Sequence, residues 1–109
     1  MSRDPHLRLQ DIIESCERLE IYIENMDFAA FEADLKTQDA VIRAFEIIGE
    51  AVKSLPEEWI EKEPDIPWRQ IAGFRDVLAH SYFAVNSSVV WAAAVEKAPF
   101  LKAACLRLC

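Results

Sequence analysis

Glycine is scarce in this sequence, and its scarcity restricts the fold. The 109 residues include two glycines and five prolines. Tight hairpin turns depend on glycine, so a sheet built from hairpins has little support. A chain of this length is large enough for one hydrophobic core and too short for two, which predicts one domain over residues 1–109. The sequence therefore favours a single all-α domain.

Long apolar runs and paired cysteines are also missing. No stretch approaches the roughly 20 apolar residues of a membrane span, and the opening MSRDPHLRLQ has no apolar run of the signal-peptide type. The three cysteines, Cys16, Cys105 and Cys109, form no C-x-x-C pair and no second cluster that would complete a zinc site. We therefore expect a reduced, soluble, cytoplasmic protein with no cofactor, no bound metal and no membrane contact.

Acidic residues outnumber basic residues by 19 to 12, which gives a net charge of -7. An acidic surface repels nucleic acid in general, and this counts against an extended RNA-binding groove. A small catalytic cleft with a local basic patch is still compatible with the charge. Arg43, Lys53 and Arg69 are the candidate contacts for RNA or a partner, and each fits a solvated surface charge equally well.

Apolar residues recur at helical spacing in the first half of the chain. One stripe runs from Leu9 to Met26 in steps of three and four. The next helix is predicted to begin at Thr37, a good N-cap, with its stripe at Val41, Phe45, Ile48, Val52 and Leu55. Between the two, residues 27–36 predict a turn or short helix, with apolar side chains tucked under the bundle: Phe28, Phe31 and Leu35.

The middle of this second helix holds Gly49, where glycine costs about 1 kcal/mol relative to alanine. Close approach of another backbone would offset that cost, and a neutral accident is the alternative. Two more helices are expected, one from Trp68 to about Ala79 and one that begins after Asn86 or Ser87 and kinks at Pro99. Short links join the four helices, so the pattern predicts an antiparallel four-helix bundle with a short extra turn.

Residues 75–82, RDVLAHSY, place several chemically capable side chains together. Asp76 and His80 are four apart, so a helix stacks them on one face, where the carboxylate could fix the imidazole tautomer and raise its basicity. The other imidazole nitrogen would then be free to move a proton. Tyr82 should lie beyond the helix end with its hydroxyl accessible.

Arg75 is a natural partner for phosphate because its guanidinium is planar, always charged and able to bind two oxygens. It lies five residues before His80, about 140° around an ideal helix, so one helix does not aim both side chains at one atom. Fraying of the helix end, or a second copy of the site across a dimer, would bring them together. Histidine with arginine suits metal-free cleavage of an RNA phosphodiester, with His80 moving protons and Arg75 stabilising the charged phosphate.

The same residues also have a structural interpretation. Arg75 would then make a surface ion pair, and the Asp76–His80 pair would staple the helix. Glu46 and Glu50 share one face of the second helix. A metal pair is one interpretation of these two acids, and salt bridges to arginines, including Arg75, are the other.

Three stretches resemble the HepT-like members of the HEPN superfamily: TQDAVIRAFEIIGEAVKSLP, PDIPWRQIAGFRDVLAHSYFAV and VW. The family's R-x4-H-x-Y motif matches Arg75, His80 and Tyr82, while Asp76 stands where asparagine is common. That aspartate would either strengthen the histidine as a base or weaken RNA binding. The resemblance covers nearly the whole chain and implies a helical bundle that forms a homodimer, with two motifs in the cleft between subunits. A dimer would also bring arginine and histidine to one atom.

The resemblance further implies the toxin of a prokaryotic type VII toxin–antitoxin system, a metal-independent ribonuclease with Arg75 and His80 catalytic and tRNA as a target. The antitoxin would be a minimal nucleotidyltransferase of the MntA type, which transfers adenylate onto the motif tyrosine, here Tyr82. Each adenylate would add negative charge and a bulky base beside the catalytic pair and repel RNA. The alternatives are a non-catalytic helical dimer that binds nucleotide and scaffolds or regulates the nucleotidyltransferase, and an interaction bundle without cleft chemistry.

Overall fold

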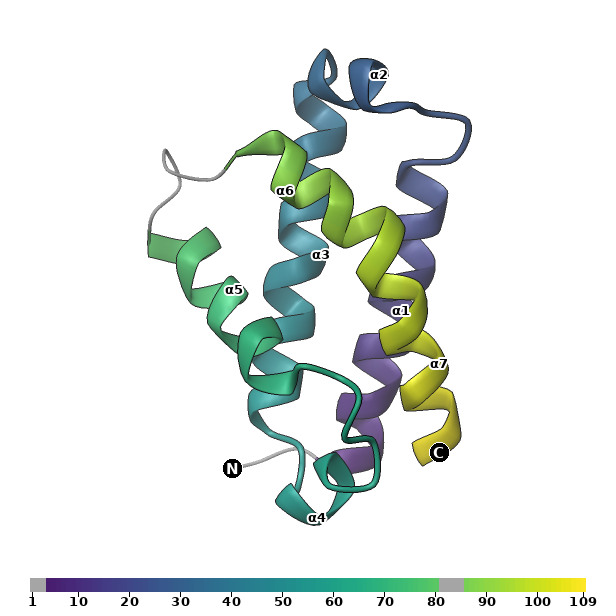
Figure 1. The fold of residues 1–109 in the computed structure, drawn as a ribbon, viewed down its shortest axis with the longest axis vertical. Helices are drawn as coiled ribbons and strands as arrows, with labels where there is room; N and C mark the ends of the chain where they lie inside the picture. Colours follow the sequence, from purple (N-terminus) through teal and green to yellow (C-terminus); the bar gives the residue numbers. More distant parts are fainter. Residues whose placement is uncertain (1–3, 81–85) are drawn as a thin grey trace.

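The computed structural model describes residues 4–80 and 86–109, apart from the side chains of residues 79 and 80. Every element in these ranges is helical, which confirms the all-α expectation for them. The long elements are α1 (Pro5–Tyr22), α3 (Leu35–Lys53), α5 (Trp68–His80) and a final run of α6 (Ser87–Ala92), η2 (Ala93–Lys97) and α7 (Ala98–Leu108). The short helices α2 (Phe28–Glu32) and α4 (Glu57–Ile60) lie at opposite ends of the molecule (Figure 1).

Helix α3 begins three residues earlier than the sequence suggests. Asp34 is its N-cap and accepts hydrogen bonds from the backbone N–H of Thr37 at 3.1 Å and from the Thr37 hydroxyl at 2.8 Å. The prediction of Thr37 as the N-cap is therefore wrong, because an earlier carboxylate uses this threonine as its donor. Leu35 becomes the first residue of α3 and is 73% exposed, so the expectation that it tucks under the bundle is also wrong.

The last helical run is interrupted just before Pro99, where a kink was expected. Asn86 caps α6 by accepting a hydrogen bond from the backbone N–H of Ser88 at 2.8 Å. The run then widens into the π-helical turn η2 and resumes as α7, which has Pro99 in its first turn. Proline lacks an N–H and crowds the preceding turn of a continuous helix, whereas the start of a helical segment tolerates it.

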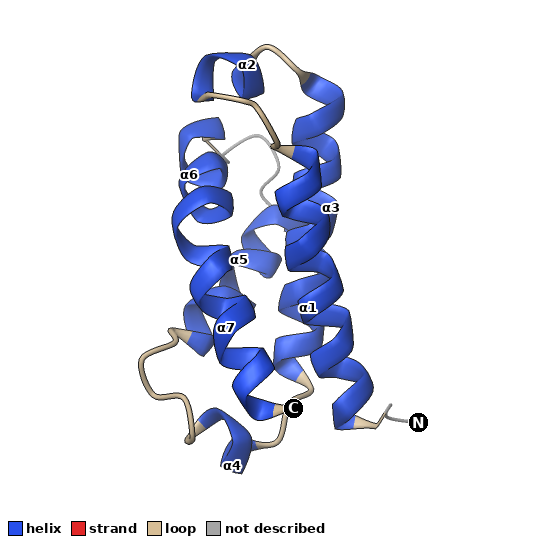
Figure 2. Cartoon of the chain, turned by 90° about the vertical axis from the view of Figure 1, so that its right-hand side faces the viewer, coloured by secondary structure: helices blue, strands red, loops and turns tan. Residues whose placement is uncertain are grey.

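Helix α3 is central, packed against α1 and against α5, while α7 packs on α1 (Figures 1 and 2). The stripe predicted for α3 is confirmed as buried: Val41, Phe45, Ile48 and Val52 on the helix, and Leu55 just beyond its C-cap. It shares one hydrophobic core with apolar residues of α1 and α7 and with the fully buried ring of Phe31 from α2. None of the described helices combines the length and the apolar character needed to cross a membrane. The packing of α3 on α5 brings the motif helix onto the core.

Candidate active site

Arg75 lies directly on Gly49, at a very close contact between α5 and α3. A Cβ atom added to Gly49 would lie 2.1 Å from the Cβ of Arg75, 2.8 Å from its Cγ and 3.4 Å from its Cα. These are the atoms at the root of the arginine side chain, which cannot swing away as a flexible tip could. The close approach expected at Gly49 is therefore confirmed, and its neighbour is the arginine of the motif.

Four charged side chains from α3 and α5 form a row in which opposite charges alternate, in the order Glu50, Arg75, Asp76 and Lys53. Arg75 Nε lies 3.4 Å from Glu50 Oε2, and Arg75 Nη1 lies 3.3 Å from Asp76 Oδ1. Lys53 Nζ donates a hydrogen bond to the same Asp76 oxygen at 2.7 Å. Asp76 therefore lies between two cations, and Arg75 lies between two carboxylates. We call these four residues the charged row.

The contact between Arg75 Nε and Glu50 is an ion pair and not a hydrogen bond. Nε is buried and has no hydrogen-bond acceptor among the described residues, although a Glu50 oxygen lies 3.4 Å away. The distance between the two atoms would allow a hydrogen bond, but the direction of the N–H bond does not, so the contact is electrostatic. The Arg75 side chain as a whole is 29% exposed, and that exposure belongs to atoms other than Nε. The guanidinium thus lies beside Glu50 on its buried side and is open to solvent elsewhere.

The charged row keeps Asp76 ionised. The hydrogen bond from Lys53 is the main cause that lowers the pKa of the Asp76 carboxyl below its ordinary value. Burial opposes this effect, and the weaker hydrogen bond from Arg75 adds to the lowering. The predicted Asp76–His80 pair lies outside the described residues on the histidine side. On the aspartate side, the carboxylate already has two cationic partners from the charged row.

The structure describes only some of the remaining predicted site residues. His80 is the last residue of α5, but its side chain, like all of Tyr82, lies outside the described residues. Arg43 is exposed and lies 3.7 Å from Glu46 on its own helix, and Arg69 is exposed on α5. The roles of these basic residues as contacts for RNA or a partner stay predictions.

The salt-bridge interpretation of the two acids on α3 is confirmed, since Glu46 pairs with Arg43 and Glu50 with Arg75. Among the side chains that the structure describes, which exclude that of His80, no group of three or more from His, Cys, Asp and Glu is placed to hold a metal ion. Sequence reasoning missed the pairing of Lys53 with Asp76. Both residues were noted for other reasons, and only the relative rotation of α3 and α5 joins them.

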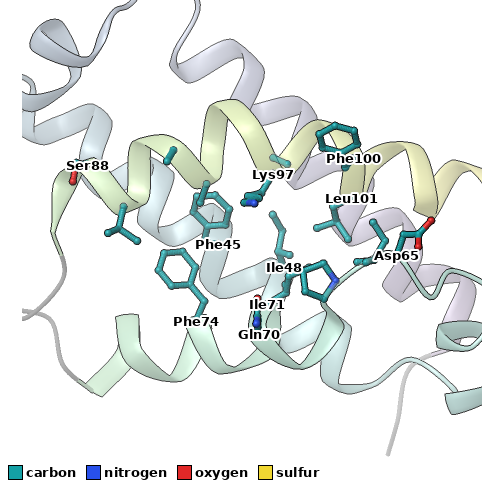
Figure 3. Close-up of a pocket in the computed structure, with 16 residues that line it drawn as sticks. Phe45, Ile48, Asp65, Gln70, Ile71, Phe74, Ser88, Lys97, Phe100 and Leu101 are labelled. Carbon is teal, nitrogen blue, oxygen red and sulfur yellow. The ribbon is translucent and has the colours of Figure 1, made fainter.

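A cleft of about 690 Å³ opens between α5 and the run from α6 to α7 (Figure 3). Its walls are mainly apolar, with Phe45 and Ile48 of α3 at its floor and Phe74 of α5 on one side. Val89 and Phe100 also line it and are largely exposed for apolar residues, at 53% and 71%. No member of the charged row lines the cleft, so the two features are separate. Nothing in the spacing of apolar residues along the sequence indicates this cleft.

Comparison with known proteins shows one consistent similarity. A family model described as Ribonuclease HepT-like matches residues 12–108. A protein of Thermococcus cleftensis named "Probable ribonuclease HepT" is 45% identical over 102 residues, which is 94% of this chain and 93% of that protein. A "Putative RNase" of Methanocaldococcus jannaschii is 43% identical over 97 residues, 89% of this chain and 80% of that protein. A "Putative RNase" of Caldanaerobacter subterraneus subsp. tengcongensis is 40% identical over 100 residues, covering 92% and 89%. No solved structure matches the chain.

Proposed function

Because the chain belongs to the HepT-like ribonuclease family, we propose that it cleaves RNA, with Arg75 and His80 as its catalytic residues. The observation that carries this proposal is the seating of Arg75 on Gly49. The Arg75 Nε is buried there without a hydrogen-bond acceptor among the described residues, and such a donor costs about 1–3 kcal/mol. Exposed ion pairs stabilise the folded state by only about 0–1 kcal/mol each. The arrangement around Arg75 thus lowers stability, which is typical of functional sites and not of a structural salt bridge.

The chemistry would need only side chains of this protein. His80 acts as general base on the ribose 2′-hydroxyl, and the 2′-oxygen attacks the adjacent phosphorus. The P–O5′ bond breaks, the leaving 5′-oxygen takes a proton, and the products are a 2′,3′-cyclic phosphate and a 5′-hydroxyl. Arg75 stabilises the additional negative charge on the pentavalent phosphate. In a homodimer that joins two motifs, one His80 is the base and the other is the acid.

The biological role that fits this activity is the toxin of a prokaryotic type VII toxin–antitoxin system, acting on tRNA in the cytoplasm as a dimeric four-helix bundle. Support comes from the sequence, in which Tyr82 follows His80 by two positions, as in the family motif. An MntA-type nucleotidyltransferase antitoxin would place adenylate on this tyrosine. The phosphodiester of the adenylate would compete with RNA for Arg75 and repel the incoming backbone.

One feature of the site favours a second candidate, a non-catalytic dimer that binds nucleotide and regulates the nucleotidyltransferase. The Arg75 guanidinium already lies beside two carboxylates, from Glu50 and Asp76, which reduces its attraction for phosphate. Both candidates use the same partner and the same residues. They differ in whether His80 turns over RNA.

Turnover therefore tests the proposal. Purified protein, shown by intact mass to carry no adenylate, is incubated with labelled tRNA and with total RNA. The wild type and Arg18→Ala, which removes an exposed arginine of α1, should cut. Arg75→Ala and His80→Ala should lose activity by about 10²–10⁴-fold. Failure of the unmodified wild type to cut either RNA would overturn the ribonuclease and leave the regulatory dimer.

A further inference from the structure

Arg75 is held at three levels along its side chain. The Cβ and Cγ atoms lie on Gly49, Nε lies beside Glu50, and Nη1 lies beside Asp76. Arginine is long and flexible, so in the absence of such contacts its guanidinium would sample many positions. An arginine that stabilises a transition state acts best when it is already in place before the reaction. The three contacts are therefore candidates for positioning.

The two carboxylates differ in how exclusively they serve Arg75. Asp76 lies closer to Lys53 than to Arg75, at 2.7 Å against 3.3 Å, and shares one oxygen between them. For Glu50, Arg75 is the one cation within 4 Å among the residues that the structure describes. Glu50 also lies beside Nε, the donor that has no hydrogen-bond acceptor among the described residues. Among the described residues, Glu50 thus has Arg75 as its one cationic partner, whereas Asp76 also pairs with Lys53.

The ion pair between Glu50 and Arg75 contributes little to the stability of the fold. The Glu50 side chain is 54% exposed, and an ion pair that reaches solvent contributes little to folding. A second acid on the same helix, Glu46, makes a comparable ion pair with Arg43 one turn earlier. The Glu46 pair joins residues of one helix, whereas the Glu50 pair reaches from α3 to the motif arginine on α5.

We propose that Glu50 is a positioning residue for Arg75, fixing the guanidinium through Nε so that it meets the phosphate undergoing cleavage. This inference rests on the proposed ribonuclease function and adds a residue outside the R-x4-H-x-Y motif to its machinery. Glu50 touches neither substrate nor the reacting atoms in this account. Its effect passes entirely through Arg75, and removal of Glu50 lowers kcat while KM stays unchanged or falls, because a negative charge near the RNA is also lost.

A double-mutant cycle on RNA cleavage tests whether Glu50 acts through Arg75. Glu50→Gln should lower kcat by about 10-fold or more in the wild-type background, because misplacement of a catalytic group is costly. In the Arg75→Lys background the same change should lower kcat by less than about 2-fold, because lysine has no guanidinium for Glu50 to position. Glu46→Gln, the matched loss of one carboxylate on α3, should leave kcat near the wild-type value. Equal losses in both backgrounds, or equal losses in both glutamine variants, would overturn the proposal.

A second measurement is independent of activity. The ¹⁵N heteronuclear NOE of the Arg75 Nε–Hε group, assigned by its absence in Arg75→Lys, should be high in the wild type and in Glu46→Gln. It should fall in Glu50→Gln toward the value of the exposed Arg18. A wild-type Arg75 signal as mobile as that of Arg18 would overturn the positioning role. An ordered, Glu50-dependent signal in a protein that does not cut RNA would support the positioning and reject the ribonuclease alone.

Discussion

Gly49 of α3 lies directly under Arg75 of α5, and this contact joins the hydrophobic core to the candidate catalytic arginine. The space that a Cβ at position 49 would occupy is already taken by the Arg75 Cβ, at 2.1 Å. The packing distance between α3 and α5 at this point therefore sets the position of the Arg75 Cβ atom. Packing and site geometry cannot be changed separately at this point.

Replacing each glycine by alanine separates this contact from helix propensity. Gly49→Ala should lower the free energy of unfolding by about 1–3 kcal/mol, because α5 must move to admit the new methyl group. Gly73→Ala on α5 meets no atom within 4 Å and should raise it by about 0.5–1 kcal/mol. Urea unfolding of the two variants and the wild type measures both changes. A Gly49→Ala variant as stable as Gly73→Ala would contradict the close contact.

The three cysteines should react at very different rates. Cys16 and Cys105 are buried, and burial raises the pKa of both thiols to about 12, so neither forms a thiolate at ordinary pH. Cys109 is exposed. Titration of the native protein with Ellman's reagent at pH 8 should show one fast thiol, and two more only after unfolding. Cys109→Ser should remove the fast reaction, and a fast thiol that persists in that variant would count against the buried positions.

The ion pair between Glu63 and Arg107 should make stability depend on acid. Arg107 Nη2 donates a hydrogen bond to Glu63 Oε1 at 2.6 Å, and Arg107 Nε donates to the same oxygen at 3.1 Å. These hydrogen bonds lower the pKa of the Glu63 carboxyl below its ordinary 4.5. A lowered folded-state pKa stabilises the protein above the unfolded value, and this contribution is lost as the pH falls through the folded value.

Glu63→Gln should therefore destabilise the protein at pH 7 and approach the wild type at pH well below 4.5. Urea midpoints at pH 7 and near pH 3 give the comparison, with the exposed Glu61→Gln as control. A Glu63→Gln effect of the same size at both pH values would show that the ion pair contributes nothing.

Two phenylalanines of opposite exposure test the described core. Phe31 is 0% exposed and Phe100 is 71% exposed. Phe31→Ala should lower the free energy of unfolding by about 3–5 kcal/mol, the usual effect of removing a buried aromatic ring. Phe100→Ala should change it by less than about 0.5 kcal/mol. Thermal or urea unfolding gives the ranking, and a reversed order would mean that α2 does not cover the core as described.

Helix periodicity accounts for what could be predicted of the fold. The stripe from Val41 to Val52 is buried as expected, because spacings of three and four residues bring side chains to one helix face. The start of α3 was misplaced because Asp34 and Thr37 are both good caps, and the choice depends on which backbone N–H each can reach.

The site was less predictable because it depends on how two helices are rotated against each other. Gly49 signalled a close approach, but nothing local to position 49 names Arg75 as the neighbour. The pairing of Lys53 with Asp76 spans 23 positions and follows from the packing of α3 on α5. The cleft beside Phe74 depends on the separation of α5 from the last helical run, which periodicity does not encode.

Arg75 and His80 are proposed to cleave RNA without a metal ion. The most direct measurement is the cleavage of purified tRNA in excess EDTA by adenylate-free wild type and by His80→Ala, with the product ends identified. We expect cutting by the wild type alone, with 2′,3′-cyclic phosphate and 5′-hydroxyl ends. Cutting that requires an added divalent cation, cutting that survives in His80→Ala, or no cutting by the wild type would contradict it.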